Sequence, residues 1–450
     1  SLRFERASND ALNITPSNVS SRKTFTVSAW IKKVDLTSNT TTAIISARVD
    51  GSNNFDLSFE DDFQLRCKIE ISDNNYFLRS TALYRDLSAW HHVVLAVDTT
   101  QSTDTNRVKL YVNGVILSSF ATSTFPGQNA DTSFNNTNLH QIGGTGGGGQ
   151  TSMYLSEMVV IDGQALDPTS FGEFDEDSGI WKPIKVSGLT FGTNGFYLEF
   201  KQAGTGTNAS GMGADTSGNN NHLAVANLTA VDQSTDTCTN NGTTFQPLDL
   251  QASTQTLAEG NLKVTTDSGG DWDTMASTIG VTSGKWYFEA KLITLGSNAI
   301  IGVIDINDAR LNTTTAYYIG QSTPGCGYQN NGARPDTGAG FGASYTNNDI
   351  IGVAIDMDNL KVYFSKNGTF QNSGNPTSGA TGTGAQDLTA STTYCFAISG
   401  YSSTVWEANF GSPPYAISSG NQDGDGYGNF EYAVPSGYFA LNTKNLAEYG

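Results

Sequence analysis

The sequence predicts an all-β protein made of two antiparallel β-sandwich domains in tandem. Ser, Thr, Asn and Gly, including 49 glycines, take the place of charged residues, so that only 15% of the chain is charged. Apolar residues recur mainly with a period of two, and capped helix patterns are nearly absent. A length of 450 residues exceeds what one hydrophobic core normally organises, which favours two domains.

The clearest strand of each half shows this alternation. Phe25, Val27, Ala29 and Ile31 occupy every second position of one stretch, and residues 285–292 alternate in the same way. A period of two is that of a strand with one buried face.

The two halves also share a hairpin pattern. In the first half, an apolar run over 92–98 ends in Asp, and a second run over 108–114 passes through Tyr to Asn-Gly. Residues 351–356 and 360–368 repeat this order in the second half. Asn-Gly accepts the positive φ of a tight hairpin turn, so we expect one architecture used twice.

Composition divides the chain into three segments. We expect one sandwich over 1–203, a connection over 204–246, and a second sandwich with a C-terminal tail over 247–450. The connection is rich in Gly and Asn and poor in aromatics, although 222–225 carry side chains able to pack. A glycine-rich surface loop is expected at 143–149.

Charge excludes two classes of partner. The net charge of −19 argues against nucleic acid and against anionic lipid, and no run approaches 18 apolar residues, so membrane insertion is not expected. Cys67, Cys238, Cys326 and Cys395 lack zinc spacing. A disulfide between Cys326 and Cys395 stays open as an alternative to free thiols.

The hairpin of the first half carries a family resemblance. Ala89-Trp90-His91-His92-Val93-Val94, followed by Asn113-Gly114, resembles the laminin-G-like (LamG) branch of the concanavalin-A-like superfamily, over about residues 2–200. The second half resembles a SPRY domain. The matching stretches of the second half are 284–289, 349–356, 362–368 and 406–411. Both resemblances imply antiparallel, jelly-roll-like sandwiches.

This pairing, with the ending 435–443, is similar to proteins of marine phages. The resemblance implies a virion structural protein on the particle exterior, in a tail fibre, head fibre or spike. Its expected partners are other virion proteins and host-surface glycan or protein, and a homo-oligomer, commonly a trimer in fibres, is expected. No signal segment stands at the start, so we expect synthesis in a host cytoplasm and location on the virion surface.

Two other readings of the function stay open. The first is a secreted bacterial lectin-like adhesin, which would be extracellular. The second is a glycan hydrolase, because some relatives carry Glu-x-Asp-x-Glu on one strand. The nearest approach here, 173–177, has the wrong spacing, and nucleophile-elbow, zinc-helix and phosphate-loop motifs are absent from the sequence. We therefore expect no enzyme activity.

Aromatic and amide side chains on loops of the second half are the candidate ligand contacts, because sugars stack on rings and bond to amides. The alternative is that Tyr328 and Tyr345 pack over the ends of the sandwich. Trp90 is expected in the core rather than on a sugar platform. The candidate ligand residues are Tyr317, Tyr318, Tyr328, Asn330, Asn331, Arg334 and Tyr345.

Two short acidic turns could hold calcium, which prefers clustered oxygen ligands. One turn contains Asp423 and Asp425, and the other contains Asp215 and Asn219. Neither completes an EF-hand, and Asp-Gly pairs are common in ordinary turns. No cofactor is required by this interpretation, and calcium is the one ion that the residues would suit.

Overall fold

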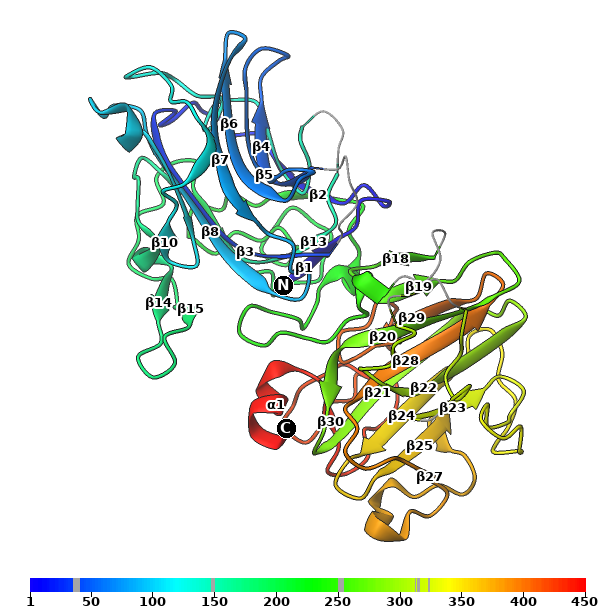
Figure 1. Ribbon diagram of the computed structural model, residues 1–450. Coiled ribbons are helices and arrows are strands. Elements are labelled where there is room, and N and C mark those ends of the chain that lie inside the picture. Colours follow the sequence, from blue (N-terminus) through cyan, green and yellow to red (C-terminus); the bar gives the residue numbers. More distant parts are fainter. Residues whose placement is uncertain (35–40, 147–149, 250–254, 312, 314–315, 323) are drawn as a thin grey trace. The chain divides into compact units, whose positions relative to one another are not determined.

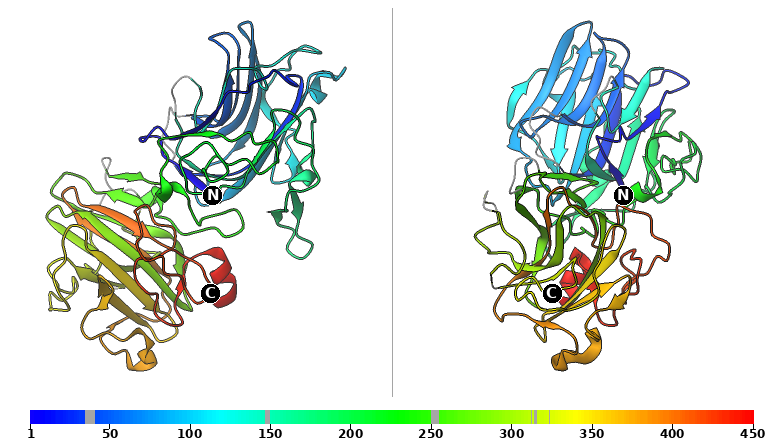
Figure 2. Two further views of the ribbon diagram at one scale, coloured as in Figure 1. Left: turned by 180° about the vertical axis from the view of Figure 1, so that it is seen from behind. Right: turned by 90° about the vertical axis from the view of Figure 1, so that its right-hand side faces the viewer.

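The computed structural model describes residues 1–34, 41–146, 150–249, 255–311, 313, 316–322 and 324–450. It divides into two compact units, Ser1–Thr239 (unit 1) and Asn240–Gly450 (unit 2). Each unit is a two-layer antiparallel sandwich, which confirms the predicted fold class (Figures 1 and 2). The loop expected at 143–149 lies partly outside the described residues.

Unit 1 packs a seven-stranded sheet against an eight-stranded sheet. The first contains, in spatial order, β1 (Leu2–Phe4), β13 (Met153–Asp162), β3 (Thr24–Lys33), β8 (Trp90–Asp98), β9 (Val108–Val112) and β10 (Val115–Ile116), with β16 (Phe196–Leu198) beside β13. The second contains β11 (Phe120–Ser123), β7 (Asn74–Leu83), β6 (Gln64–Ile71), β5 (Asn54–Phe59), β4 (Thr42–Arg48), β12 (Leu139–Ile142), β2 (Ala11–Ile14) and β17 (Ala224–Ala226). A small hairpin, β14 (Gly172–Phe174) and β15 (Trp181–Pro183), completes the unit.

The alternation seen in the sequence sorts side chains between the faces of these sheets. Phe25, Val27, Ala29 and Ile31 of β3 all point into one core cluster. The predicted pair of strands is present as β8 and β9, and Asn113 (φ 48°) and a glycine form the tight turn between β9 and β10. The positive φ of Asn113 is what the Asn-Gly signal predicts.

Unit 2 packs a nine-stranded sheet against a four-stranded sheet. The first contains β18 (Thr256–Ala258), β19 (Lys263–Thr265), β29 (Val405–Asn409), β21 (Lys285–Thr294), β24 (Ile350–Asp356), β25 (Lys361–Lys366) and β26 (Thr369–Phe370), with β27 (Gln386–Asp387) beside β25 and β30 (Phe439–Ala440) beside β21. The second contains β20 (Trp272–Val281), β28 (Tyr394–Tyr401), β22 (Asn298–Asp305) and β23 (Gly325–Gln329). A short helix, α1 (Thr443–Tyr449), follows β30.

The structure places the domain boundary differently from the expected connection over 204–246. Residues up to Thr239 belong to unit 1, where β17 pairs with β2 and Leu223 is fully buried. The remaining residues belong to unit 2, where Phe245 is fully buried. The Gly- and Asn-rich composition therefore builds turns between a few apolar anchors rather than a flexible connection.

Two buried ion pairs fasten this stretch to unit 1. Arg3 pairs with Asp232 at 3.2 Å, and Lys32 pairs with Asp236 at 2.8 Å. The side chains of Arg3 and Lys32 are at most 1% exposed. Removing one partner of a buried pair leaves a charge without its counter-ion, which is strongly destabilising.

A truncation experiment tests this boundary. We expect a fragment of residues 1–239 to unfold cooperatively, whereas a fragment of residues 1–203 lacks Asp232 and Asp236 and loses roughly 3–5 kcal/mol for each pair. Thermal melting followed by circular dichroism measures the difference. Equal melting temperatures for the two fragments would contradict the assignment of 204–239 to unit 1.

In unit 2, a buried carboxylate ties the chain after β29 to the nine-stranded sheet. Glu289 of β21 is fully buried. Its oxygens accept hydrogen bonds from the backbone N–H groups of Glu431 (2.9 Å) and Tyr432 (2.8 Å) and from the hydroxyl of Tyr287 (3.0 Å). Burial raises the pKa of Glu289 to about 7 in spite of these hydrogen bonds.

The raised pKa of Glu289 predicts a loss of stability with rising pH. The unfolded carboxyl ionises near pH 4.5 and the folded one near 7, so the contribution of Glu289 to the free energy of unfolding is highest below pH 4.5 and falls by about 3 kcal/mol as the pH rises to 7 and above. Urea unfolding of the whole chain at a series of pH values measures this loss.

The matched variants are Glu289→Gln and, as control, Glu448→Gln, which changes an exposed carboxyl. Between pH 4.5 and 7, the change in the free energy of unfolding should lose the contribution of Glu289, about 3 kcal/mol, in Glu289→Gln and should be unaltered in Glu448→Gln. Glu289→Gln also loses an acceptor, which lowers its stability at every pH by a roughly constant amount. The same pH slope in Glu289→Gln as in the unchanged chain would refute the assignment.

Candidate functional site

The sequence-predicted ligand tyrosines of unit 2 lie mostly in the core. Tyr317, Tyr328 and Tyr345 are at most 2% exposed. The hydroxyl of Tyr345 donates to the carbonyl oxygens of Tyr328 (2.8 Å) and Ala299 (3.0 Å). The expectation that these three rings contact a ligand was wrong, because the rings are buried inside the unit. For Tyr328 and Tyr345, the structure shows the alternative, in which the rings pack in the sandwich.

The other predicted ligand residues of that loop make internal contacts. Asn330 Oδ1 accepts from the backbone N–H of Ala299 (3.0 Å), and Asn331 Oδ1 accepts from that of Ala333 (2.9 Å). Arg334 forms an ion pair with Asp336 (2.6 Å). Tyr318 lies apart from these residues and is half-buried.

The two calcium candidates are turns whose carboxylates already accept protein hydrogen bonds. Asp215 accepts from the backbone N–H groups of Tyr197, Ser217 and Asn221. Asn219 donates its amide to the carbonyl oxygen of Gly195. The carboxylate of Asp215 is thus engaged by three backbone donors.

The second candidate, Asp423, accepts from the backbone N–H groups of Asp425, Tyr427 and Ala440 and from the amide of Asn445. The side chain of Asp425 is exposed. In the described part of the chain, no three His, Cys, Asp or Glu residues gather closely enough to hold a metal ion.

All four cysteines are free. Cys326 and Cys395 are both buried, so the disulfide that the sequence left open is not formed. Burial raises the pKa of Cys326 to about 12, which keeps this thiol protonated and unreactive.

A serine and a histidine lie in hydrogen-bonding contact in unit 1, but their geometry opposes catalysis. His92 Nε2 lies 2.8 Å from Ser28 Oγ, and His92 Nδ1 accepts from the indole N–H of Trp181 (3.0 Å). Nδ1 is thus unprotonated, so Nε2 carries the proton and donates to the serine instead of abstracting from it. Burial lowers the pKa of His92 to about 3. The histidine is a neutral core residue stacked between Trp30 and Trp181.

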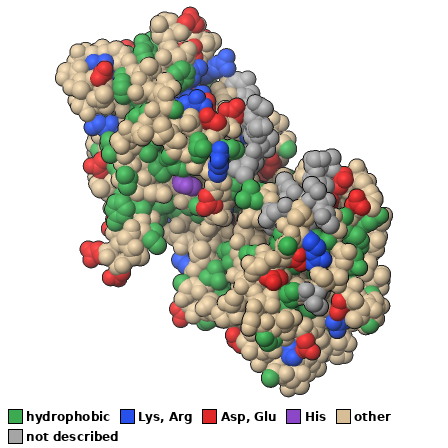
Figure 3. Space-filling view, viewed as in Figure 1, with side chains coloured by type: hydrophobic (Ala, Val, Ile, Leu, Met, Phe, Trp, Pro, Cys, Tyr) green, Lys and Arg blue, Asp and Glu red, His purple; other side chains and the backbone are tan. Residues whose placement is uncertain are grey.

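The acidic run 173–177 lies on the hairpin β14–β15, which projects from unit 1 and carries red acidic atoms at its tip in Figure 3. Lys182 pairs with Glu173 (3.4 Å) and Asp175 (3.0 Å), and Glu173 is exposed. Hydrogen bonds from Ser178 and Lys182 hold the pKa of Asp175 below its usual range. The acids are therefore solvated and paired rather than directed into a sugar-binding groove.

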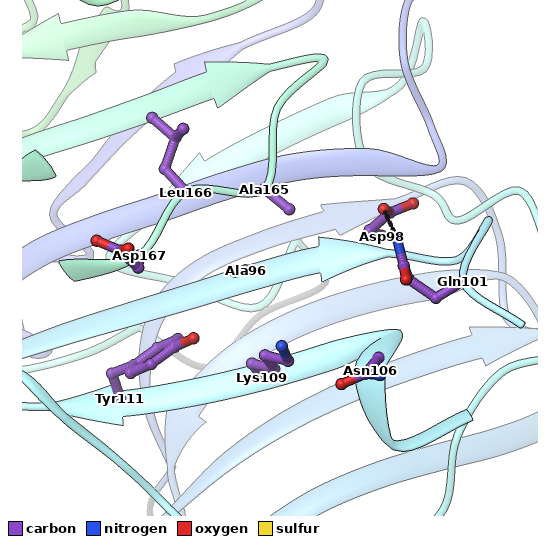
Figure 4. Close-up of a pocket in the computed structure, with 9 residues that line it drawn as sticks. All are labelled: Ala96, Asp98, Gln101, Asn106, Lys109, Tyr111, Ala165, Leu166 and Asp167. Carbon is purple, nitrogen blue, oxygen red and sulfur yellow. Dashed lines mark hydrogen bonds between the residues drawn. The ribbon is translucent and has the colours of Figure 1, made fainter. Parts of the chain in front are cut away.

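One hollow of unit 1 lies on the outer face of the seven-stranded sheet and has a volume of about 400 Å³ (Figure 4). Its floor is the small side chain of Ala96 on β8. The neighbouring strand β9 contributes Lys109 and Tyr111, which alternate with the buried Val108 and Leu110. The full lining is Ala96, Asp98, Gln101, Asn106, Lys109, Tyr111, Ala165, Leu166 and Asp167.

The opposite wall is a loop that hydrogen-bonds to Thr26 of β3. The hydroxyl of Thr26 donates to the carbonyl oxygen of Gln164 and accepts from the backbone N–H of Leu166, both at 2.8 Å. Asp167 begins a short 3₁₀ turn, Pro168–Ser170, and its carboxylate accepts from the N–H of Thr169 (2.9 Å). The wall is therefore held in place before any ligand arrives.

Among the charged side chains of this hollow, Asp98 has hydrogen-bond partners, whereas Lys109 has no described ion-pair partner. Partial burial acts to raise the pKa of Asp98, but hydrogen bonds from Thr100 and Gln101 outweigh it and lower that pKa. Burial and the carboxylate of Asp167 raise the pKa of Tyr111, so its hydroxyl stays protonated and able to donate. No described carboxylate forms an ion pair with Lys109. The ring of Tyr111, the ammonium of Lys109 and side-chain amides therefore line the same hollow.

A second hollow of about 270 Å³ in unit 1 contains two carboxyl groups. Glu157 sits at a bulge of β13 with φ 47° and accepts from the hydroxyl of Tyr197. Burial raises the pKa of Glu157, and Glu199 raises it further. Glu199 itself is held by Lys201 at 2.5 Å. Glycoside hydrolysis uses two carboxyl groups in one hollow, although Glu199 is already paired with Lys201 here.

Sequence reasoning did not single out either hollow. The alternation over 108–111 marks Lys109 and Tyr111 as outward-facing, which was the one signal available for the larger hollow. The loop 163–167 gives no such signal, because its position depends on a hydrogen bond to Thr26, more than 130 residues away along the chain.

Comparison with known proteins supports the fold class of unit 1. A family model described as the concanavalin A-like lectin/glucanases superfamily matches residues 6–168. That superfamily contains both sugar-binding proteins and glycosidases. No curated protein sequence matches the chain.

Among solved structures, the chain is similar to the SPRY domain of human HERC1, with 17% identity, 36% of this chain and 96% of that chain covered, and a TM-score of 0.29. It is also similar to a heptameric SAP-like pentraxin from Limulus polyphemus, with 20% identity, 35% and 71% covered, and a TM-score of 0.25. A third is domain 4 of AbnA, a GH43 extracellular arabinanase from Geobacillus stearothermophilus in complex with arabinotriose, with 24% identity, 34% and 65% covered, and a TM-score of 0.26.

In the described residues, no helix has the length and apolar character needed to cross a membrane.

Proposed function

We propose that this chain is a non-catalytic structural protein on the exterior of a phage particle, in a tail fibre, head fibre or spike, that binds host-surface glycan. The hollow over Ala96 carries the binding part of the proposal, because it combines an aromatic ring with hydrogen-bonding groups on a rigid sheet. Calcium is not required, since sugar hydroxyls meet the side chains directly.

The shape of the hollow suits a sugar in two ways. The half-buried ring of Tyr111 offers an apolar surface to the C–H face of a pyranose, while Asn106, Gln101 and Lys109 offer donors to its hydroxyls. The carboxylate of Asp98 already receives the amide of Gln101 at 2.6 Å, so part of the polar lining is oriented in advance. Preorganisation of this kind reduces the entropy lost on binding.

Removing the ring of Tyr111 tests the binding. We expect Tyr111→Ala to weaken retention on immobilised neutral glycans (a β-1,3-glucan, a β-1,4-glucan, a mannan and a galactan) by about tenfold for whichever of them the chain binds, which corresponds to about 1.4 kcal/mol. Affinity is measured on the whole chain by surface plasmon resonance.

Tyr76→Ala is the matched control, because Tyr76 is a half-buried tyrosine of the other sheet of unit 1. Its retention should equal that of the unchanged chain. Equal retention of Tyr111→Ala and Tyr76→Ala contradicts the assignment of the hollow. Release of reducing ends from the same glycans, lost in Glu157→Gln, would instead support the glycan hydrolase alternative.

The virion part of the proposal rests on the tandem LamG-like and SPRY-like pattern and on the chain's acidic, amide-rich composition, which suits a particle surface. We expect mass spectrometry to find the chain in purified phage particles and antibody labelling to place it outside the capsid or tail, as a homo-oligomer with other virion proteins. Its absence from particles, together with its presence in a bacterial culture medium, would favour the secreted adhesin.

A further inference from the structure

The outer face of the four-stranded sheet of unit 2 ends in a row of aromatic and amide side chains. Trp272 of β20 lies opposite Tyr401 of β28, and Tyr401 lies opposite Asn298 of β22. Residues directly opposite one another on neighbouring strands share a face of the sheet. The three side chains therefore form one continuous row.

The next rows of the same face are covered by the chain itself. Four residues from Trp272 and from Tyr401 on the same strands, Ala276 and Ala397 belong to a buried cluster with Leu311, Tyr317 and Ile319. The row that begins with Trp272 lies at the margin of this cover, and its side chains are half-buried rather than buried. The cover thus stops at an edge formed by aromatic rings.

Tyr318 brings a third ring to this edge. The centroids of Trp272 and Tyr318 lie 5.0 Å apart, and those of Trp272 and Tyr401 lie 5.6 Å apart. Mutual contact at these distances fixes the orientation of the rings without removing them from solvent. Of the residues predicted from sequence as ligand contacts in unit 2, Tyr318 is the one that lies in such a cluster.

The polar atoms at the edge are open to a ligand. No described residue accepts a hydrogen bond from the indole N–H of Trp272 or pairs with the hydroxyls of Tyr318 and Tyr401. Asn298 Oδ1 accepts from the amide of Gln329 at 3.2 Å, which extends the row by a second amide. Apolar ring faces flanked by donors of this kind are what a sugar ring requires.

We propose that Trp272, Tyr318, Tyr401 and Asn298 form a second glycan-binding surface, which takes neutral hexopyranose chains. Charge selects this ligand class: the row itself is uncharged, the exposed Asp271 precedes Trp272, and the chain carries a net charge of −19, which disfavours sulfated or uronate polymers. The surface stands independently of the hollow over Ala96. Two glycan surfaces in one chain would raise avidity on a polymer that presents many sugar units.

Trp272→Ala tests the surface on the whole chain with the same four neutral glycans. We expect retention to fall about tenfold in Trp272→Ala and in Tyr401→Ala, and to stay within about twofold in Trp272→Phe, which keeps a ring. Tyr449→Ala is the matched control, since Tyr449 is a half-buried ring of unit 2 that stacks on Phe439 instead. Circular dichroism verifies that each variant is folded. If Trp272→Ala does not fold, retention of Tyr401→Ala tests the proposed surface.

Retention of the unit 2 variants is compared with that of Tyr111→Ala in unit 1. Loss in Trp272→Ala or Tyr401→Ala with residual binding in Tyr111→Ala supports a second surface. Loss in Tyr111→Ala alone, with the unit 2 variants binding like the unchanged chain, overturns this inference and leaves the hollow of unit 1 intact. Failure of the unchanged chain to bind any of the four glycans overturns both.

Discussion

The structure depends on the covering of outer sheet faces as much as on the burial of inner ones. A sandwich buries one face of each sheet, but here apolar residues stand on outer faces as well. Val94 and Ile161 form a second cluster under Phe171 in unit 1, and Tyr287 and Tyr363 form another in unit 2. Long connections must lie across these faces, since exposed apolar area of that size is unfavourable in water.

The connections that cover the outer sheet faces are fixed by buried polar groups. These groups determine where each covering connection ends. Thr26 holds the loop beside the hollow, Glu289 holds the chain over the nine-stranded sheet, and Asp215 and Asp423 close turns within such connections. Each carboxylate acts as a multiple acceptor of backbone N–H groups. The acidic turns that resemble cation sites in the sequence have this fastening role in the structure.

The sequence predicted the fold well and the sites poorly, for one physical reason. Alternation over 25–31 and Asn113-Gly114 are local signals, and local periodicity decides strands and hairpins. Whether Tyr328 is a ligand contact or a core residue depends on which connection lies over it, and the sequence carries no local sign of that. The sequence predicts a connection over 204–246 for the same reason, because Arg3 and Lys32, which fasten its first part to unit 1, stand some 200 residues earlier.

The proposal of binding rather than catalysis rests on how the reactive groups are used. Ser28 and His92 are in contact, yet the indole of Trp181 fixes the histidine in the tautomer that cannot activate the serine. Glu157 combines a raised pKa with a place in a hollow, but its neighbour Glu199 is paired with Lys201. What remains open at the margins of the covers, in both units, is aromatic and amide surface on rigid strands. Such surface recognises hydroxyl-rich ligands by shape and hydrogen bonding without making or breaking their bonds.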